Sequence, residues 1–376
     1  MIVALYVILG VYLLLIGSFI FGFYRLNTFY PQRTPLNVCF SVIIPFRNEE
    51  QHLPKLLSSI VQLDYPKQTF ECIFVDDDSN DDSVPLIQRY LTNTGIDFKI
   101  INSQRISPSP KKDAITTAIH QAQFDWIITT DADCLLPQQW LNTFAAFSEK
   151  QPTKMIVGPV TYTSSATPSF LTYFQILDFM SLQGSTVGGF GIGHPFLCNG
   201  ANLAYKKHHF IQLNGFKGND TIASGDDIFL FEKFIHAFPR QVHFLRSRAA
   251  MVSTFPLESW KAVIEQRTRW AAKSGAYNMT FAKLVGLIVL FMNLGVLMSP
   301  AVFFLVDKQL YILGIIPLKL IADVTLIGVT INNYSKKKVR LLPFLLASMW
   351  YPFFSIYIVF RALFYRYSWK ERKFRS

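Results

Sequence analysis

The sequence is poor in charged residues. Only 16% of its 376 residues are Asp, Glu, Lys or Arg, whereas 51% are hydrophobic and 35 are Phe. Soluble globular domains carry about 25% charged residues, so this composition excludes an ordinary soluble protein and predicts membrane segments. The length allows one or two domains with a sizeable core.

No charged residue occurs from Ile2 to Tyr24, a stretch long enough to cross a hydrocarbon core of about 30 Å. The stretch also lacks the basic n-region and small-residue cleavage site of a signal peptide. We therefore expect residues 1–24 to form an uncleaved transmembrane anchor. Its amino terminus would lie outside, and residues 25–280 would lie in the cytosol.

Three more apolar stretches lie in the last hundred residues, at 284–306, 310–331 and 341–364. The first two suit an antiparallel helical hairpin, because only Asp307-Lys308-Gln309 separates them. The third has basic residues on both sides, and both flanks favour the cytosol. Those residues are Lys336, Lys337, Lys338 and Arg340 before it, and Arg366, Lys370, Arg372, Lys373 and Arg375 after it. A plain third crossing is favoured, although Pro352 also allows a broken or re-entrant segment.

The sequence does not favour a nucleic-acid-binding protein, a zinc protein or a Walker-type nucleotide-binding protein. The net charge of +11 comes from clusters beside apolar spans, so anionic lipid headgroups explain it better than nucleic acid does. The four cysteines show no paired zinc-type spacing and are expected to be reduced thiols of a cytosolic compartment. No Walker-type glycine loop occurs. Lys319 and Asp323, inside a predicted span, are either a neutralising pair or a functional site.

Between the membrane stretches, strands alternate with helices. Residues 38–45, 70–79, 98–101 and 126–130 have the pattern of buried strands, and 49–63, 83–91 and 111–122 that of helices. This alternation predicts an α/β fold with a parallel sheet covered by helices on both faces. In such sheets, ligands bind outside the carboxyl ends of the strands.

Two of these strands end in clustered acids. Asp76, Asp77 and Asp78 lie at the end of the second strand, and Asp131 and Asp133 follow the fourth. One such cluster alone could be a polar turn, but two at one edge of a sheet indicate a site. Mg²⁺ or Mn²⁺ takes one or two carboxylates together with substrate phosphates. Asp131 and Asp133 suit that use, and Asp76 and Asp77 could hold a nucleoside.

The rest of the polar region adds further candidates. Residues 155–163 resemble a strand, and the glycine-rich 188–207 a loop that walls a cleft. Asp226 and Asp227 open an amphipathic helix, 223–235, where one could act as a general base or both could be acids favoured at a helix start. A second helix, 257–275, is amphipathic and basic, and is expected along the membrane surface. It carries Gln266, Arg269 and Trp270 roughly on one side, and Arg269 offers a fork for a departing phosphate.

Six segments in this order resemble a membrane-bound family-2 glycosyltransferase with a GT-A fold: SVIIPFRNEE, VDDDSNDDS, KKDAITTAIHQAQFDWIITTDADC, CNGANLAYKK, SGDDIFL and QRTRW, the last being a QxxRW element. The resemblance covers about residues 38–275. The GT-A fold it implies has a Rossmann-like mixed sheet with helices on both faces. It further implies inverting transfer by a single displacement, with a nucleotide-sugar donor, a UDP-sugar above all, and Mg²⁺ or Mn²⁺.

The resemblance also assigns roles to residues. It implies Asp76 and Asp77 for the nucleotide, Asp131 and Asp133 for the diphosphate and metal, and Lys111 or Lys112 for the donor. It implies Asp227 as the catalytic base. It implies Gln266, Arg269 and Trp270 for the diphosphate and the mouth of the acceptor site. Because Asp226 replaces the family's usual glutamate, Asp226 stays open as an alternative base.

The sequence thus predicts four parts: an anchor at 1–24, a GT-A catalytic domain at 25–256, an interfacial helix at 257–280, and a membrane region of two to three spans at 281–376. We expect a multi-pass protein of a bacterial inner membrane whose cytosolic domain glycosylates a lipid or a membrane-proximal glycan. Two alternatives stay open. One is a processive polysaccharide synthase, and the other is a membrane scaffold or transporter without enzymatic activity.

Overall fold

The computed structural model describes residues 2–31, 38–163, 167–220, 222, 224–306, 310–334, 340–365, 367–369 and 372–374. The chain folds into two compact units. The helical unit comprises residues 1–26, 164–197 and 256–376, and the α/β unit comprises 27–163 and 198–255. The segment 164–197 therefore belongs to the helical unit, although both of its neighbours in the sequence belong to the α/β unit.

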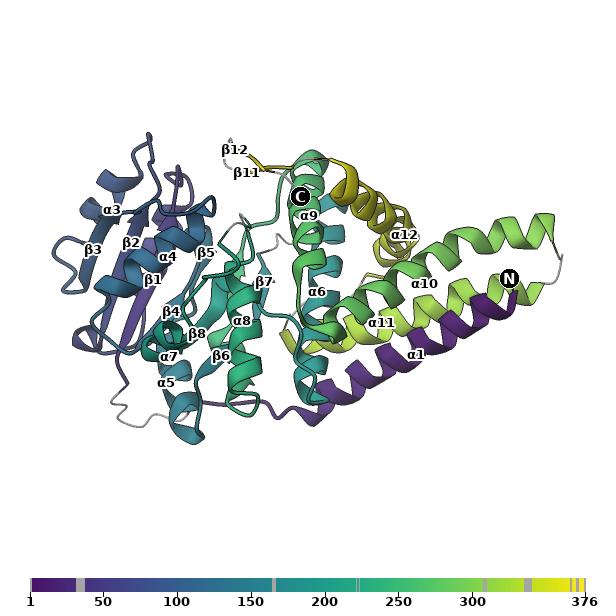
Figure 1. The fold of residues 1–376 in the computed structure, drawn as a ribbon, viewed down its shortest axis with the longest axis horizontal. Helices are drawn as coiled ribbons and strands as arrows, with labels where there is room; N and C mark the ends of the chain where they lie inside the picture. The colour runs from purple at the N-terminus through teal and green to yellow at the C-terminus, as the bar shows by residue number, and fades with distance from the viewer. Residues whose placement is uncertain are drawn as a thin grey trace. The chain divides into compact units, whose positions relative to one another are not determined.

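The α/β unit contains a seven-stranded sheet in the order β3-β2-β1-β4-β8-β6-β9 (Figure 1). The first four strands in the chain are mutually parallel where they pair. The next in the sheet, β8, is antiparallel to both of its neighbours, so the predicted parallel arrangement holds up to β4 and the whole sheet is mixed. The strands are β1 (Phe40–Phe46), β2 (Phe70–Asp76), β3 (Asp97–Asn102), β4 (Trp126–Thr129), β6 (Met155–Val157), β8 (Leu203–Lys206) and β9 (Val242–Phe244).

Helices connect the parallel strands, as the alternation predicts. In α2 (Leu53–Val61) the side chains Leu53, Leu56, Leu57 and Ile60 are buried at the predicted helical spacing. Helix α4 packs on β1 and β2. The other helices of this unit are α3 (Ser83–Leu91), α4 (Pro110–Gln121), α5 (Trp140–Lys150), α7 (Lys207–Gln212) and α8 (Asp226–Ala237).

Two predictions for the middle of the chain need correction. Residues 155–163 form two strands rather than one, because β7 (Val160–Tyr162) leaves the large sheet and joins β5 (Cys134–Leu135) and β10 (Val252–Thr254) in a three-stranded sheet. The break lies at Gly158, where a Cβ atom would overlap the side-chain amide of Asn202. Residues 188–207 are not one loop, because they begin in the last turn of a helix, include β8 and end at the first residue of the next helix.

The helical unit contains α1 (Ile2–Arg25), α6 (Phe170–Gly191), α9 (Trp260–Ala272), α10 (Thr280–Leu305), α11 (Ile315–Tyr334), α12 (Leu341–Phe364) and the short pair β11 (Tyr367–Trp369) and β12 (Arg372–Phe374). Within the described residues, four helical segments are long and apolar enough to cross a membrane: Ile2–Arg25, Thr280–Leu305, Ile312–Tyr334 and Leu341–Phe364. Large apolar side chains such as Leu14, Phe304 and Leu342 are exposed on them. Such exposure suits contact with lipid rather than water.

The last of these segments is one continuous helix. Helix α12 runs through Pro352 without a break, so the structure does not contain the broken element that this proline allows. The charge conflict itself rests on residues 336–338 and on most of the basic tail, whose side chains lie outside the described residues. The predicted link 307–309 lies outside them too.

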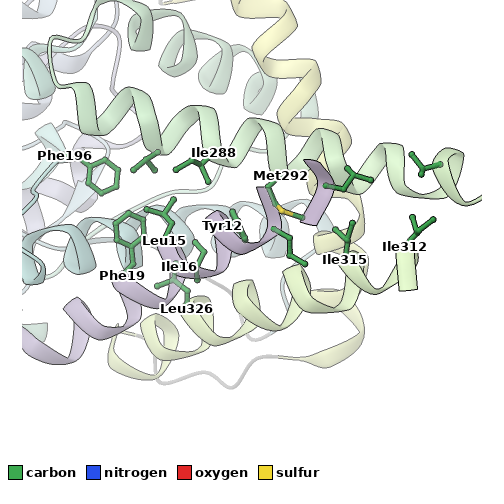
Figure 2. Packing of buried hydrophobic residues seen from close by; sticks show 14 residues of the cluster. Tyr12, Leu15, Ile16, Phe19, Phe196, Ile288, Met292, Ile312, Ile315 and Leu326 are labelled. Carbon is green, nitrogen blue, oxygen red and sulfur yellow. The ribbon is translucent and has the colours of Figure 1, made fainter. Parts of the chain in front are cut away.

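The core of the helical unit joins α1 to α10 and α11 (Figure 2). Tyr12 and Phe19 of α1 lie in one cluster of buried side chains with Met292 of α10 and Leu326 of α11. Lys319 and Asp323 form an ion pair with an Nζ–Oδ2 distance of 2.6 Å, and the hydroxyl of Tyr12 donates to the same aspartate. The predicted neutralising pair is thus present, and it also bonds α11 to α1.

Candidate active site

The candidate site lies at the carboxyl edge of the parallel strands in the α/β unit. Strand β2 ends at Asp76, β1 is followed by Arg47, and β4 is followed by Thr130 and Asp131. The strand order 3-2-1-4 changes direction between β1 and β4. Open α/β sheets bind ligands at this kind of switch point, so the topology places both acidic clusters at the edge where a site is expected.

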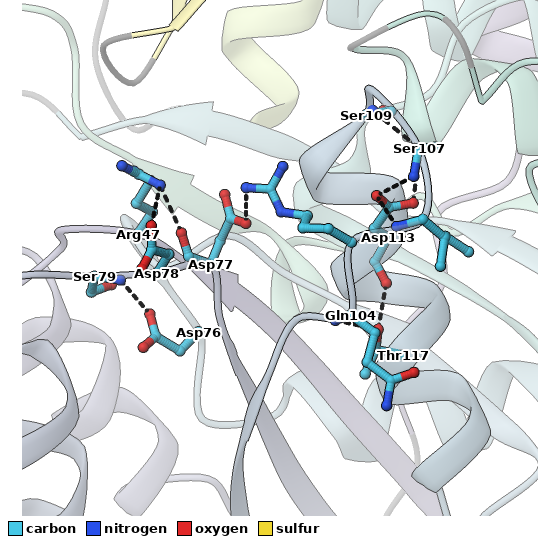
Figure 3. Close-up of polar contacts among 12 residues, drawn as sticks. Arg47, Asp76, Asp77, Asp78, Ser79, Gln104, Ser107, Ser109, Asp113 and Thr117 are labelled. Atoms are coloured by element: carbon cyan, nitrogen blue, oxygen red, sulfur yellow. Dashed lines mark hydrogen bonds and ion pairs between the residues drawn. The ribbon is translucent and has the colours of Figure 1, made fainter.

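The three acids Asp76, Asp77 and Asp78, at the end of β2, do not share one environment (Figure 3). Asp76 accepts a hydrogen bond from the backbone N–H of Ser79 at 2.9 Å and so stabilises its own turn. Asp77 is buried and forms an ion pair with Arg105. Asp78 has a positive φ of 67° and an exposed side chain. Of the two acids predicted for the nucleotide, Asp77 is therefore held by a cation and Asp76 by its turn.

Two arginines to which the sequence analysis assigned no role stabilise this loop, Arg47 within the SVIIPFRNEE segment and Arg105 outside the quoted segments. Arg47 donates from Nη1 to the backbone carbonyl of Asp77 at 2.9 Å and lies 3.7 Å from a carboxylate oxygen of Asp78. Arg105 comes from the segment after β3. Nothing in the spacing of residues 77 and 105 connects them, and only the pairing of β2 with β3 brings them together.

Lys111 connects the acids of two elements. Its Nζ lies 2.7 Å from Asp131 Oδ1, after β4, and 3.1 Å from Asp226 Oδ2, at the start of α8. Burial lowers the pKa of the Lys111 ammonium, but the charges of Asp131 and Asp226 outweigh burial and raise that pKa above its usual range. Lys111 is therefore protonated at working pH and offsets the charge of both carboxylates.

Asp227, the predicted base, is oriented by backbone groups. Its Oδ2 accepts from the N–H of Gly200 at 3.2 Å, and its Oδ1 accepts from the N–H of Ile228 at 2.7 Å. A Cβ atom on Gly200 would lie 3.1 Å from Asp226 Oδ2 and 3.3 Å from Asp227 Cβ. This contact is tighter than ordinary packing, so the absence of a side chain at Gly200 lets its backbone reach the acids.

Asp133, the second residue of the predicted metal pair, accepts a hydrogen bond from Thr254 Oγ1 at 3.1 Å. Within the described part of the chain, no three His, Cys, Asp or Glu side chains are grouped to hold a metal ion. Two carboxylates nevertheless fit Mg²⁺ or Mn²⁺ when a diphosphate completes the shell. The contact between Asp131 and the Lys111 ammonium shows that this carboxylate, 36% exposed, can accept a cation.

The two neighbouring lysines predicted for the donor have different surroundings. Lys112 is buried, and its Nζ donates to the backbone carbonyls of Asn219 at 2.5 Å and Ile222 at 2.8 Å. It also lies 4.9 Å from the ring centroid of Phe229. Lys112 thus stabilises the segment before α8, and Lys111 is the lysine that contacts the acids.

Gln266, Arg269 and Trp270 lie on α9 of the helical unit, and their role at the diphosphate and acceptor remains a prediction. The structure adds Arg267, which is buried on this helix together with Val263 and Thr268. Its guanidinium donates to Gln266 Oε1 and lies 4.2 Å above the ring of Trp270. The motif pattern QxxRW leaves this position unspecified, so the motif provides no reason to select Arg267.

Two family models match the chain. The model described as glycosyl transferase family 2 matches residues 41–204, and the model described as glycosyl transferase family group 2 matches residues 126–366. The second match covers more than half of the chain and includes QxxRW and the C-terminal helices.

Curated proteins show the same relationship. The chain is 26% identical over 237 residues to the probable glycosyltransferase YdaM of Bacillus subtilis, covering 61% of this chain and 54% of that protein. It is 29% identical over 118 residues to the poly(ribitol-phosphate) beta-N-acetylglucosaminyltransferase TarS of Staphylococcus aureus, covering 31% and 20%. An undecaprenyl-phosphate 4-deoxy-4-formamido-L-arabinose transferase of Pseudomonas syringae is 33% identical over 114 residues, covering 29% and 32%. The matches thus span between a fifth and about half of these relatives' lengths.

A solved structure supports the fold. The mannosyltransferase PcManGT of Pyrobaculum calidifontis, solved with GDP-mannose and Mn²⁺, is 18% identical, with a TM-score of 0.54 over 97% of this chain and 99% of that one. At this identity the likeness concerns the fold alone. Together with the family models it shows that the chain belongs to the family-2 glycosyltransferases and has their GT-A fold.

Proposed function

We propose that this glycosyltransferase moves a sugar, with inversion, from a nucleotide-diphosphate sugar to a hydroxyl of a lipid or a membrane-proximal glycan. The observation that supports this most is the bridge made by Lys111, 2.7 Å from Asp131 and 3.1 Å from Asp226. The Lys111 ammonium contacts both Asp131, proposed for the diphosphate, and Asp226, which is adjacent to the proposed general base Asp227. A donor's anomeric carbon and an acceptor's hydroxyl can therefore meet within one small site.

Three aspartates of the α/β unit have proposed roles in donor binding. Asp77 holds the nucleoside, while Asp131 and Asp133 hold Mg²⁺ or Mn²⁺, which neutralises charge on the leaving diphosphate when it is bound. A UDP-sugar is the expected donor. Because PcManGT was solved with GDP-mannose, GDP-sugars belong in the same test.

Asp227 is the proposed base. Its carboxylate takes the proton of the acceptor hydroxyl while the acceptor oxygen bonds to the anomeric carbon. The bond between that carbon and the phosphate oxygen breaks at the same time, and the nucleoside diphosphate leaves with the electron pair. Asp226 is less suited, because its carboxylate is already paired with Lys111, whereas backbone N–H groups orient Asp227.

The acceptor is proposed from the membrane helices and the relatives. In the part of the chain that the structure describes, four segments are long and apolar enough to span a bilayer. One relative is named as an undecaprenyl-phosphate 4-deoxy-4-formamido-L-arabinose transferase. We propose that the catalytic domain lies on the cytosolic side of a bacterial inner membrane, with α9 along its surface. Single addition is preferred over processive synthesis, since four spans leave little room for a polymer channel.

The test uses the full-length chain in detergent or nanodiscs with a panel of UDP- and GDP-sugars, Mn²⁺ or EDTA, and lipid-phosphate acceptors. We expect metal-dependent transfer to one donor, an inverted anomeric configuration by NMR, and one sugar per acceptor. A ladder of longer products would favour the processive alternative. A folded sample that binds and turns over none of these donors would overturn the proposal.

A further inference from the structure

Helix α6 holds the beginning of α9 in a fixed register. The side chain of Gln175 donates to the backbone carbonyl of Leu257 at 2.9 Å and accepts from the N–H of the same residue at 2.9 Å. One residue before it, Phe174 packs against Trp260 with ring centroids 5.3 Å apart. Leu257 lies three residues before α9, and Trp260 is the first residue of α9. These contacts therefore fix where the helix starts.

One turn further along α6, a buried ion pair holds the middle of α9. Arg267 Nε lies 2.6 Å from Asp178 Oδ2, and the two side chains are 7% and 6% exposed. Gln175, Asp178 and Phe179 are spaced three and four residues apart, so they share one face of α6. Because both side chains are buried, water does not compete for this ion pair, and the pair holds the two helices in one arrangement.

The guanidinium of Arg267 also contacts two members of the QxxRW element. It donates to Gln266 Oε1 and lies 4.2 Å above the ring of Trp270. Adjacent residues on a helix do not face each other, so the bond to Gln266 requires the guanidinium to reach around the helix. Trp270 is also 6.4 Å from the ring of Phe179, the residue after Asp178. Asp178 is thus connected to Gln266 and Trp270 through Arg267, and Phe179 lies directly beside Trp270.

We propose that Asp178 is a positioning residue for the transfer reaction, acting through Arg267. The ion pair fixes the rotation of α9 about its axis, and the guanidinium fixes the side chains of Gln266 and Trp270 as one set. This inference rests on the proposed function, because it takes the QxxRW residues to act in transfer. It adds two residues to that site: Asp178 of α6, which is outside the motif, and Arg267, at an unspecified position within it.

A second ion pair on α9 provides a matched control. Arg361 of α12 lies 2.6 Å from Glu265, with side chains 20% and 24% exposed. It has the same N–O distance and also involves α9. Arg361→Gln removes this ion pair by changing a side chain of α12 and leaves every side chain of α9 unchanged, so the contacts of Arg267 with Gln266 and Trp270 stay in place.

The experiment is a double-mutant cycle between Asp178→Asn and Trp270→Phe, measured as kcat/KM of transfer. We expect Asp178→Asn to lower kcat/KM about tenfold and Arg361→Gln to lower it less than about twofold. If Asp178 acts through the motif, the double variant will lie within about twofold of the worse single variant, because both changes remove the same interaction. The affinity for a nucleoside monophosphate, which lacks the diphosphate assigned to the QxxRW residues, should change less than about twofold.

Asp178→Asn leaves a buried guanidinium without its counter-charge and could unfold the chain. The variant Asp178→Asn with Arg267→Gln removes both charges and is expected to keep the wild-type Tm while staying about tenfold slower. The inference is overturned if the loss of kcat/KM in the double variant equals the product of the two single losses, or if Asp178→Asn is no slower than Arg361→Gln. Absence of turnover in the wild type would instead overturn the proposed function, and this inference with it.

Discussion

The ammonium of Lys111 lies 2.7 Å from the carboxylate of Asp131, the acid proposed to bind the diphosphate and its metal ion. The Lys111 ammonium and a metal ion bound to the same carboxylate would repel each other, because both are positively charged and only a few ångströms would separate them. Metal and donor are therefore expected to weaken the contact with Lys111, which can then bind a phosphate oxygen while remaining close to Asp226.

The first prediction concerns Lys111→Gln. Without the ammonium, the carboxylates of Asp131 and Asp226 lose their shared cation, which we expect to cost about 1–3 kcal/mol of folding free energy. Mn²⁺ alone should restore part of it, so the rise in Tm on adding Mn²⁺ should be larger in the variant than in the wild type. Thermal unfolding with and without Mn²⁺ measures this.

Lys112→Met is the matched control for that experiment. It removes the hydrogen bonds to the carbonyls of Asn219 and Ile222 and should lower Tm as well, but its response to Mn²⁺ should equal that of the wild type. An equal Mn²⁺ response in all three proteins would show that Lys111 and the metal do not use the same carboxylate.

The second prediction concerns the base. Asp227→Asn removes the proton acceptor and should lower kcat roughly 10³-fold, within the range for a general base. Binding of donor with Mn²⁺, measured by calorimetry, should be nearly unchanged. Asp226→Asn breaks the contact with Lys111 instead, so its larger effect should be on KM for the donor. The opposite pattern would assign the base to Asp226.

The third prediction concerns Arg105, which pairs with the buried Asp77. Arg105→Gln removes the guanidinium that pairs with this carboxylate, so the segment around Asp77 should be less well ordered. We expect about tenfold weaker UDP binding with kcat at saturating donor changed less than about threefold, which is the pattern of lost ground-state binding. Arg105→Lys should be intermediate. A loss confined to kcat would argue against a role for this pair in nucleotide binding.

The fourth prediction concerns pH. Burial lowers the pKa of His243 below its ordinary value, and the carbonyl of Pro152 offsets this only in part. A histidine whose pKa is lower in the folded than in the unfolded state contributes stability above about pH 6.5, and this is lost as the pH falls. Tm should therefore drop between pH 7.5 and 5.5, and His243→Gln should reduce that drop. An unchanged drop would remove His243 as a cause.

The sequence alone determined the elements whose pattern is local. Apolar runs such as Leu341–Phe364 set the spans, because crossing a bilayer requires about 20 apolar residues in a row. Alternating strand and helix patterns determined the first half of the sheet and placed Asp76, Asp77, Asp131 and Asp133 at strand ends, since periodicity within one element reports which face is buried. The resemblance supplied the family, which the family models confirm.

Only the tertiary structure decided which partner each of two adjacent residues contacts. Lys111 and Lys112 are neighbours in the chain, yet one pairs with Asp131 and the other is buried against carbonyls. The pairs Asp77–Arg105 and Asp178–Arg267 join residues 28 and 89 positions apart. Such contacts depend on how each helix is rotated and on which strands pair. Packing of the whole chain sets both, and no local pattern in the sequence records them.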